Sequence, residues 1–145
     1  MRLFYKTYLS GSISQHEMNP SKNYWTKEDE YELENIFNKK KLKLKVMNPN
    51  DDLYQTIADL YDYEMNYISE CDFILVDLSE RRGMGVGYEL QYAYSKNIPI
   101  YAVLPNIGYY KNSETGYIHP FARKTVTDSF ETKEKLFYYL NEKKF

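Results

Sequence analysis

The chain has 145 residues, of which 43% are hydrophobic and 28% charged, and this length and balance predict one domain, residues 1–145, with a buried core. Its 19 Lys and Arg against 21 Asp and Glu leave a net charge of −2, which argues against binding to a nucleic-acid polymer through phosphate contacts. No apolar run approaches the roughly 18 residues of a membrane span, and no charged-then-apolar leader opens the chain, so we expect no membrane association.

Strand-like and helix-like patterns alternate along the chain. Residues 3–9 are rich in β-formers, and Phe73-Ile74-Leu75-Val76 is a continuous apolar run, typical of a strand buried on both faces. Thr26 followed by Asp29 has the spacing of a capping box and predicts the start of a helix. We expect further strands at 39–46, 99–104 and 125–127, helices at 52–69, after Gly83 and at 131–141, and a polar loop at 106–117. This alternation predicts parallel βαβ units in a three-layer α/β sandwich.

In such sheets ligands bind at the carboxyl ends of the strands, and the loop after Val76 is the most informative one there. Gly83, Gly85 and Gly87 let the backbone approach a ligand closely, and the following helix start offers free N–H groups and a positive dipole end. Glu89 lies in the first turns of that helix, where the dipole favours the ionised carboxylate that a nucleophile or base requires. The alternative is that Glu89 only stabilises the helix, and the G-x-G spacing is no full dinucleotide fingerprint.

Glu64 and Asp77 each have a functional and a structural interpretation as well. Glu64 lies four residues after Leu60 and four before Ile68, on the helix face that should pack inward. A carboxylate there must be paired, hydrogen-bonded or exposed in a cleft, unless it lies at the edge of the apolar stripe with its head in water. Asp77 ends the buried strand at the ligand-binding edge, where it either contacts a ligand or caps the following turn.

The end of the first strand carries hydroxyl groups and a glycine. Ser10-Gly11-Ser12-Ile13-Ser14 suits a phosphate or a sugar, although by itself it is an ordinary strand-to-loop turn. Tyr8, near the end of that strand, faces either the core or the site, and the pattern alone favours the core.

The residues that bind metals are scarce. His16 and His119 are far apart in the sequence, and the one cysteine, Cys71, excludes an internal disulfide and a multi-cysteine site. No zinc spacing, P-loop or Gly-x-Ser-x-Gly elbow is present, so we expect no metal site.

We interpret the lysines at 39–41, 43 and 45 as the solvent-facing side of a strand. The single cysteine favours a reducing, cytoplasmic location.

Three segments in the right order resemble the nucleoside 2-deoxyribosyltransferase superfamily, and within it 2'-deoxynucleoside 5'-phosphate N-hydrolases most of all. Tyr8-Leu9-Ser10-Gly11-Ser12-Ile13 is similar to the first-strand motif, and Cys71-Asp72-Phe73-Ile74-Leu75-Val76-Asp77-Leu78 to the third strand. Gly85-Val86-Gly87-Tyr88-Glu89-Leu90 is similar to the helix that carries the catalytic glutamate. The resemblance implies a flavodoxin- or Rossmann-like three-layer sandwich with a five-stranded parallel sheet.

The resemblance implies three catalytic residues and no cofactor. Glu89 would be the nucleophile that attacks the anomeric carbon of a 2-deoxyribosyl group, as in a retaining glycosidase. Glu64 stands where the family has an aspartate, and would contact the sugar and assist as acid or base. Tyr8 matches a family tyrosine that orients the catalytic glutamate, which reverses the preference for a core role.

The resemblance also implies the residues that contact the substrate. These are Gly11, Ser12, Ile13, Ser14, Leu60, Asp77, Gly83, Gly85 and, from a neighbouring subunit, His119. The family hydrolases have an arginine where this chain has Ser14 and a serine where it has Gly83, so Arg81, Arg82 or Arg123 would have to supply the positive charge. A site completed by a second subunit implies a homodimer.

These implications lead to one predicted function with two alternatives. We predict hydrolysis of the N-glycosidic bond of 2'-deoxynucleoside 5'-monophosphates, which releases the free base and deoxyribose 5-phosphate. The first alternative is a nucleoside 2-deoxyribosyltransferase that exchanges bases with the same glutamate. The second is a catalytically silent nucleotide-binding sensor, which the departures at Glu64 and Ser14 keep open.

Overall fold

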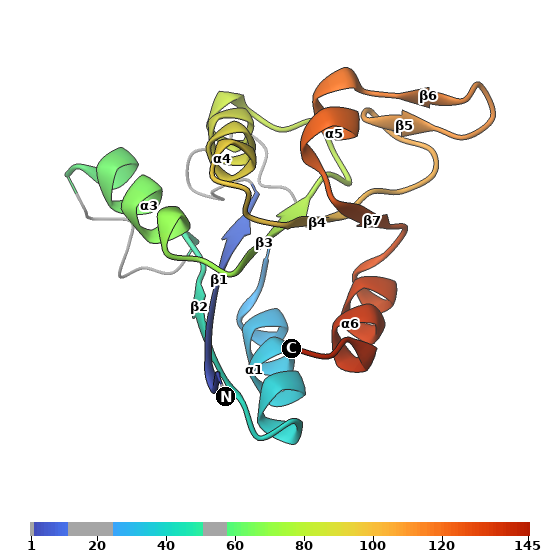
Figure 1. Cartoon of the computed structure of the whole chain (residues 1–145). Helices are drawn as coiled ribbons and strands as arrows, with labels where there is room; N and C mark the ends of the chain where they lie inside the picture. Colours follow the sequence, from blue (N-terminus) through green and yellow to red (C-terminus); the bar gives the residue numbers. More distant parts are fainter. Residues whose placement is uncertain (1, 12–24, 51–57) are drawn as a thin grey trace.

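The computed structural model describes residues 2–11, 25–50 and 58–145 and shows a three-layer α/β sandwich (Figure 1). Its central sheet has the strand order β2-β1-β3-β4-β7, and every neighbouring pair is parallel. The strands are β1 (Phe4–Ser10), β2 (Lys43–Met47), β3 (Phe73–Asp77), β4 (Ile100–Val103) and β7 (Asp128–Phe130). The predicted five-stranded parallel sheet is therefore confirmed.

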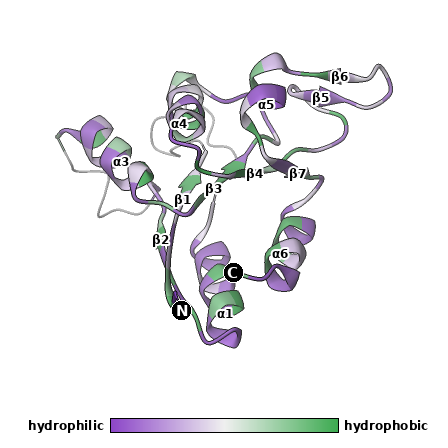
Figure 2. Cartoon of the chain, in the orientation of Figure 1, coloured by the Kyte–Doolittle hydropathy of each residue, from purple (hydrophilic) through white to green (hydrophobic). Residues whose placement is uncertain are grey.

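Helices cover both faces of the sheet. α1 (Lys27–Lys39) and α6 (Lys133–Glu142) lie on one face, and α3 (Leu60–Ser69), α4 (Met84–Ser95) and the short α5 (Pro120–Thr125) lie on the other (Figure 1). Hydrophobic and hydrophilic residues alternate along α1 and α6 (Figure 2), as expected for helices that bury one side against a sheet. Among the described residues, no helix is both long and apolar enough to cross a bilayer.

The middle strand shows how the sequence fills both layers. All five residues of β3 are buried, and successive side chains of a strand point to opposite faces. Phe73 and Leu75 join the core under α1 and α6, whereas Ile74 and Val76 join the core under α3 and α4. A continuous apolar run is what a strand with two covered faces requires.

The capping box predicted before α1 is present. The Thr26 hydroxyl accepts a hydrogen bond from the Asp29 backbone N–H at 3.2 Å, and the Asp29 carboxylate accepts one from the Thr26 N–H at 2.9 Å. Two N–H groups that the helix itself cannot satisfy are thus bonded reciprocally.

The last third of the chain differs from the expectation. Residues 125–127 do not form the last strand, which is Asp128–Phe130. Thr125 is instead the last residue of α5. This helix begins at Pro120, which suits the first helical turn, and His119 caps it, with its Nδ1 accepting from the Phe121 N–H at 3.3 Å.

Two other expected segments also change. The polar loop expected at 106–117 contains part of a short antiparallel hairpin, β5 (Lys111–Asn112) and β6 (Tyr117–Ile118). The helix expected at 52–69 begins at Leu60 within the described part of the chain, and residues 51–57 lie outside it.

Thr26→Ala should lower the free energy of unfolding by about 1 kcal/mol, because it removes the oxygen that bonds the Asp29 N–H. Thr26 is exposed, so little packing is lost with it. Urea denaturation measures the change, with Thr26→Ser as the control that keeps the oxygen. An equal loss in both variants would contradict a capping role.

Candidate active site

The candidate site lies where the carboxyl ends of β1 and β3 meet α4. Glu89 sits in the second turn of α4 and is buried, on the same side of the helix as Val86, Leu90 and Ala93. These apolar residues pack into the core between α4 and the sheet. Because Glu89 shares their face, the helix carries its carboxyl group inward, toward the strands.

Two hydroxyl groups of β1 bind the Glu89 carboxyl group. Tyr8 Oη donates to Oε2 at 2.5 Å, and Ser10 Oγ donates to Oε1 at 2.7 Å. Tyr8 and Ser10 are two residues apart, so they point to the same face of the strand. Each carboxyl oxygen therefore has its own donor, and both donors are completely buried.

A second carboxyl group, that of Glu64, faces the same place from α3. Glu64 is buried, and its charge and a hydrogen-bonding interaction reach both Glu89 and Tyr8. The structure thus brings together Tyr8, Glu64 and Glu89, the three residues for which the sequence predicts catalytic roles. Their combination supplies two acids and a phenol in a site shielded from water.

Burial is the main cause of an unusual protonation state. Burial, with a smaller contribution from the charge of Glu64, raises the pKa of Glu89 to about 8, although the hydrogen bonds from Tyr8 and Ser10 act in the lowering direction. Burial and the two carboxylates likewise raise the pKa of Tyr8 well above its ordinary value, so its hydroxyl keeps its proton. With its pKa raised in this way, Glu89 keeps its proton near neutral pH beside the second carboxyl group.

Asp77 has partners within its own loop. Its Oδ1 accepts hydrogen bonds from the Ser79 N–H at 2.9 Å and the Ser79 hydroxyl at 2.5 Å. The same oxygen lies 3.3 Å from Nη2 of Arg82, and both side chains are 1% exposed. Asp77 therefore shapes the turn after β3, as the capping interpretation predicts, and Arg82 is engaged with it.

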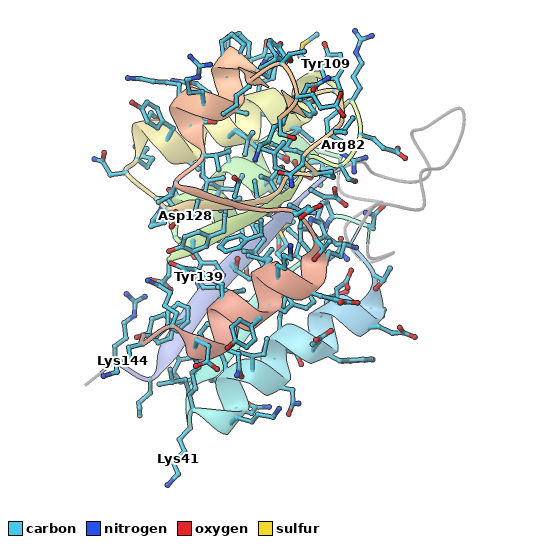
Figure 3. The ribbon with its side chains drawn as sticks, turned by 90° about the vertical axis from the view of Figure 1, so that its right-hand side faces the viewer. Lys41, Arg82, Tyr109, Asp128, Tyr139 and Lys144 are labelled. Carbon is cyan, nitrogen blue, oxygen red and sulfur yellow. The ribbon has the colours of Figure 1, made fainter. Side chains whose placement is uncertain are left out.

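Arg82 also links this turn to the β5–β6 region. Its Nε donates to the Asp77 carbonyl at 2.8 Å, and its backbone N–H donates to the Tyr110 hydroxyl at 2.8 Å. The Tyr110 ring packs edge-on against His119, with the ring centres 5.4 Å apart. Figure 3 shows Arg82 and Tyr109 at the same end of the molecule, away from Lys41 and Lys144.

Four of the remaining predicted contact residues, Gly11, Leu60, Gly83 and Gly85, lie in the described part of the chain. Gly83 is the N-cap of α4, and a Cβ added at Gly83 or Gly85 would meet nothing within 4 Å. Leu60 is the first residue of α3 and is partly exposed. Gly11 is buried, and a Cβ there would lie 3.5 Å from the Trp25 ring. Ser12, Ile13 and Ser14 lie outside the described residues.

Sequence reasoning missed the individual role of Ser10 and the part played by Trp25. Ser10 was visible only as a member of the first-strand motif, although its spacing from Tyr8 places both side chains on one face. Trp25 donates from Nε1 to the Ser10 carbonyl at 2.8 Å, a contact that no sequence spacing reveals. Among the described residues there is no group of three or more His, Cys, Asp or Glu side chains that could hold a metal ion.

Protonation of Glu89 should make stability depend on pH. Because its pKa is about 8 in the folded chain against an ordinary value of 4.5, the folded state binds the extra proton between these values. The free energy of unfolding should therefore fall as the pH rises from 5 to 8. Glu89→Gln should flatten this slope in urea denaturation, and Glu114→Gln, an exposed control, should keep it. An unchanged slope in Glu89→Gln would contradict the protonation state described above.

No family model and no curated protein matches the chain. Solved structures that are similar to the chain include the following two. A 2-deoxyribosyltransferase from Leishmania mexicana is 18% identical over 97% of this chain and 99% of its own, with a TM-score of 0.58. A conserved protein from Enterococcus faecalis V583 is 16% identical over 96% of this chain and 98% of its own, with a TM-score of 0.60. The chain therefore shares the fold of these two proteins over nearly its whole length.

Proposed function

We propose that the chain hydrolyses the N-glycosidic bond of 2'-deoxynucleoside 5'-monophosphates, with Glu89 as the nucleophile. The observation that carries the proposal is the carboxyl group of Glu89, buried at the carboxyl edge of the sheet and bound by Tyr8 and Ser10 beside a second acid. A glutamate that only stabilised its helix would need neither burial nor two donors. The segments that resemble the deoxyribosyltransferase superfamily, and the fold shared with one such transferase, point to the same chemistry.

In the first step, an oxygen of ionised Glu89 forms a bond to the anomeric carbon while the bond from that carbon to the base nitrogen breaks. The electron pair of the broken bond passes to the base, which takes up the proton held by Glu64. The transition state has oxocarbenium character, so positive charge develops on the sugar next to the Glu89 carboxylate. Glu89 holds its proton in the resting site, so in this proposal the proton passes to Glu64 as Glu89 becomes the nucleophile, which leaves one acid ionised and the other protonated.

In the second step, water replaces the base. Its oxygen bonds to the anomeric carbon, the ester bond to Glu89 breaks, and the electron pair returns to the carboxylate. Glu64, now ionised, takes the proton that the water loses, and the free sugar phosphate leaves. Both acids then have their starting charges, and the configuration at the anomeric carbon is retained.

The start of α4 is the proposed place for the 5'-phosphate. This helix has no acidic residue in its first turn and no side-chain hydrogen bond from its N-cap, Gly83, so its N–H groups face outward with the positive dipole end. Arg81 is exposed and lies over the Tyr109 ring, 5.5 Å from its centre. Arg81 supplies the positive charge in this proposal, because Arg82 is engaged with Asp77.

The proposal includes a homodimer in which His119 of one subunit reaches the site of the other. Its Nδ1 accepts a backbone hydrogen bond from Phe121, so Nε2 carries the proton and is the donor. Large apolar side chains on α4 and α5 are exposed in the single chain, with Met84 and Phe121 at 75% and 74%. Such surfaces are typical of interfaces.

The second candidate is base exchange, in which the base of another nucleoside replaces water in the second step. The observation that favours it is the similar structure from Leishmania mexicana, which is a 2-deoxyribosyltransferase. The two reactions share the first step. They differ in whether the sugar is released without an added base.

A panel of ribo- and deoxynucleosides, with and without a 5'-phosphate, tests the proposal. We expect free base from the deoxy substrates and none from the ribo substrates, with the 5'-monophosphate reacting faster than the nucleoside without the phosphate. Glu89→Ala should lower base release by at least about a thousandfold, because the nucleophile is lost. Glu114→Ala, which removes an exposed hairpin acid, should react like the wild type. Chromatography of the released base measures the reaction of each substrate and of each variant.

Three outcomes would contradict the proposal in different ways. New nucleoside formed only when a second base is added identifies the transferase. Nucleotide binding without any base release supports a silent sensor. Activity of Glu89→Ala within a few-fold of the wild type would remove Glu89 from the nucleophile's role.

A further inference from the structure

The two oxygens of the Glu89 carboxyl group accept hydrogen bonds from two different residues, Tyr8 and Ser10. Tyr8 has a role in the proposed reaction, whereas Ser10 has none so far. Yet Ser10 Oγ donates to Oε1 at 2.7 Å, and Tyr8 Oη donates to Oε2 at 2.5 Å. Ser10 is completely buried, so no water competes for its hydroxyl group.

The backbone of Ser10 is held from two directions. On one side it pairs with Val76 in the register of β1 and β3. On the other, its carbonyl accepts a hydrogen bond from the indole of Trp25, which is itself almost fully buried. A serine side chain has a single heavy-atom torsion, so a fixed backbone leaves its Oγ few positions to adopt.

The hydrogen bonds from Tyr8 and Ser10 restrict rotation of the Glu89 carboxyl group about its last torsion. The last torsion of a glutamate is broad, and one hydrogen bond lets the carboxyl plane turn about the bonded oxygen. Two donors, one on each oxygen, fix the plane. Each ionised oxygen has two lone pairs, so each keeps one for attack on a substrate carbon.

We propose that Ser10 is a positioning residue for Glu89, which together with Tyr8 fixes the plane of the carboxylate and favours its ionised form. The inference rests on the proposed function, because positioning matters only if Glu89 reacts. Ser10 acts through Glu89 and touches no substrate in this account. Its hydroxyl also opposes the effect of Glu64, whose charge disfavours a second carboxylate nearby.

Thr7 offers a matched control on the same strand. It is completely buried too, and its hydroxyl donates to the Phe73 carbonyl at 2.9 Å. Thr7 is one residue from Tyr8 and three from Ser10, so its side chain points to the opposite face of β1. Thr7→Val therefore removes a buried hydroxyl group from β1 without touching Glu89.

The first measurement needs no substrate. Carbon NMR of the full chain with labelled glutamate side chains follows the titration of Glu89, whose signal is assigned by its loss in Glu89→Gln. Ser10→Ala should shift this titration to higher pH, and Thr7→Val should leave it in place. An identical titration in Ser10→Ala and the wild type would overturn the proposal. Ser10→Cys, with a weaker donor, should give an intermediate shift and provides a second variant if Ser10→Ala does not fold.

The second measurement uses turnover. Ser10→Ala should lower kcat about tenfold to a hundredfold, the usual effect of losing one hydrogen bond to a charged group, with KM within about threefold. The acidic limb of its pH profile should move to higher pH, and Thr7→Val should keep both kcat and the profile. An unchanged kcat and profile in Ser10→Ala would overturn the inference. Wild-type protein inactive on every substrate defeats the proposed function instead, and the titration still shows whether Ser10 binds the carboxylate.

Discussion

A carboxyl group buried beside a second carboxyl group is the constraint on which the rest of the site depends. Ionised Glu89 is costly in this position because it loses water and faces Glu64. The hydroxyl groups of Tyr8 and Ser10 offset part of that cost, one for each oxygen. The balance raises the pKa of Glu89 to about 8, so a small change in its surroundings decides whether the carboxyl group is ionised near neutral pH.

The scaffold around this pair is built to keep it in place. Pairing of β1 with β3 and the Trp25 hydrogen bond hold the strand that carries both donors, while the face of α4 that bears Val86 and Leu90 anchors Glu89. The Asp77–Arg82 pair shapes the turn that leads into α4, and Tyr110 ties this turn to the hairpin region. These contacts hold Tyr8, Ser10 and Glu89 together, and the glycine-rich start of α4 is open, because a Cβ added at Gly83 or Gly85 would meet nothing within 4 Å.

Much of this arrangement was predictable from the sequence because it depends on local patterns. The apolar run of β3, the capping box at Thr26 and the alternation of strands and helices indicated the sheet and the edge at which ligands bind. The last strand was misplaced because Thr125 belongs to α5, which begins at Pro120 and is capped by His119, and the strand begins only at Asp128. The contacts of Ser10 with Glu89 and Trp25 join segments whose three-dimensional distance no spacing rule supplies. The pairing of Arg82 with Asp77 depends on the conformation of the turn between them.

The central claim, that Glu89 is the nucleophile, is tested most directly by trapping the covalent intermediate. The protein is mixed with a deoxynucleoside monophosphate, quenched with acid within milliseconds to seconds, digested and analysed by mass spectrometry. The account predicts that the peptide carrying Glu89 gains the mass of one deoxyribosyl 5-phosphate group, and that Glu89→Gln shows no such adduct. An adduct on another carboxylate, or rapid base release by Glu89→Gln, would contradict it.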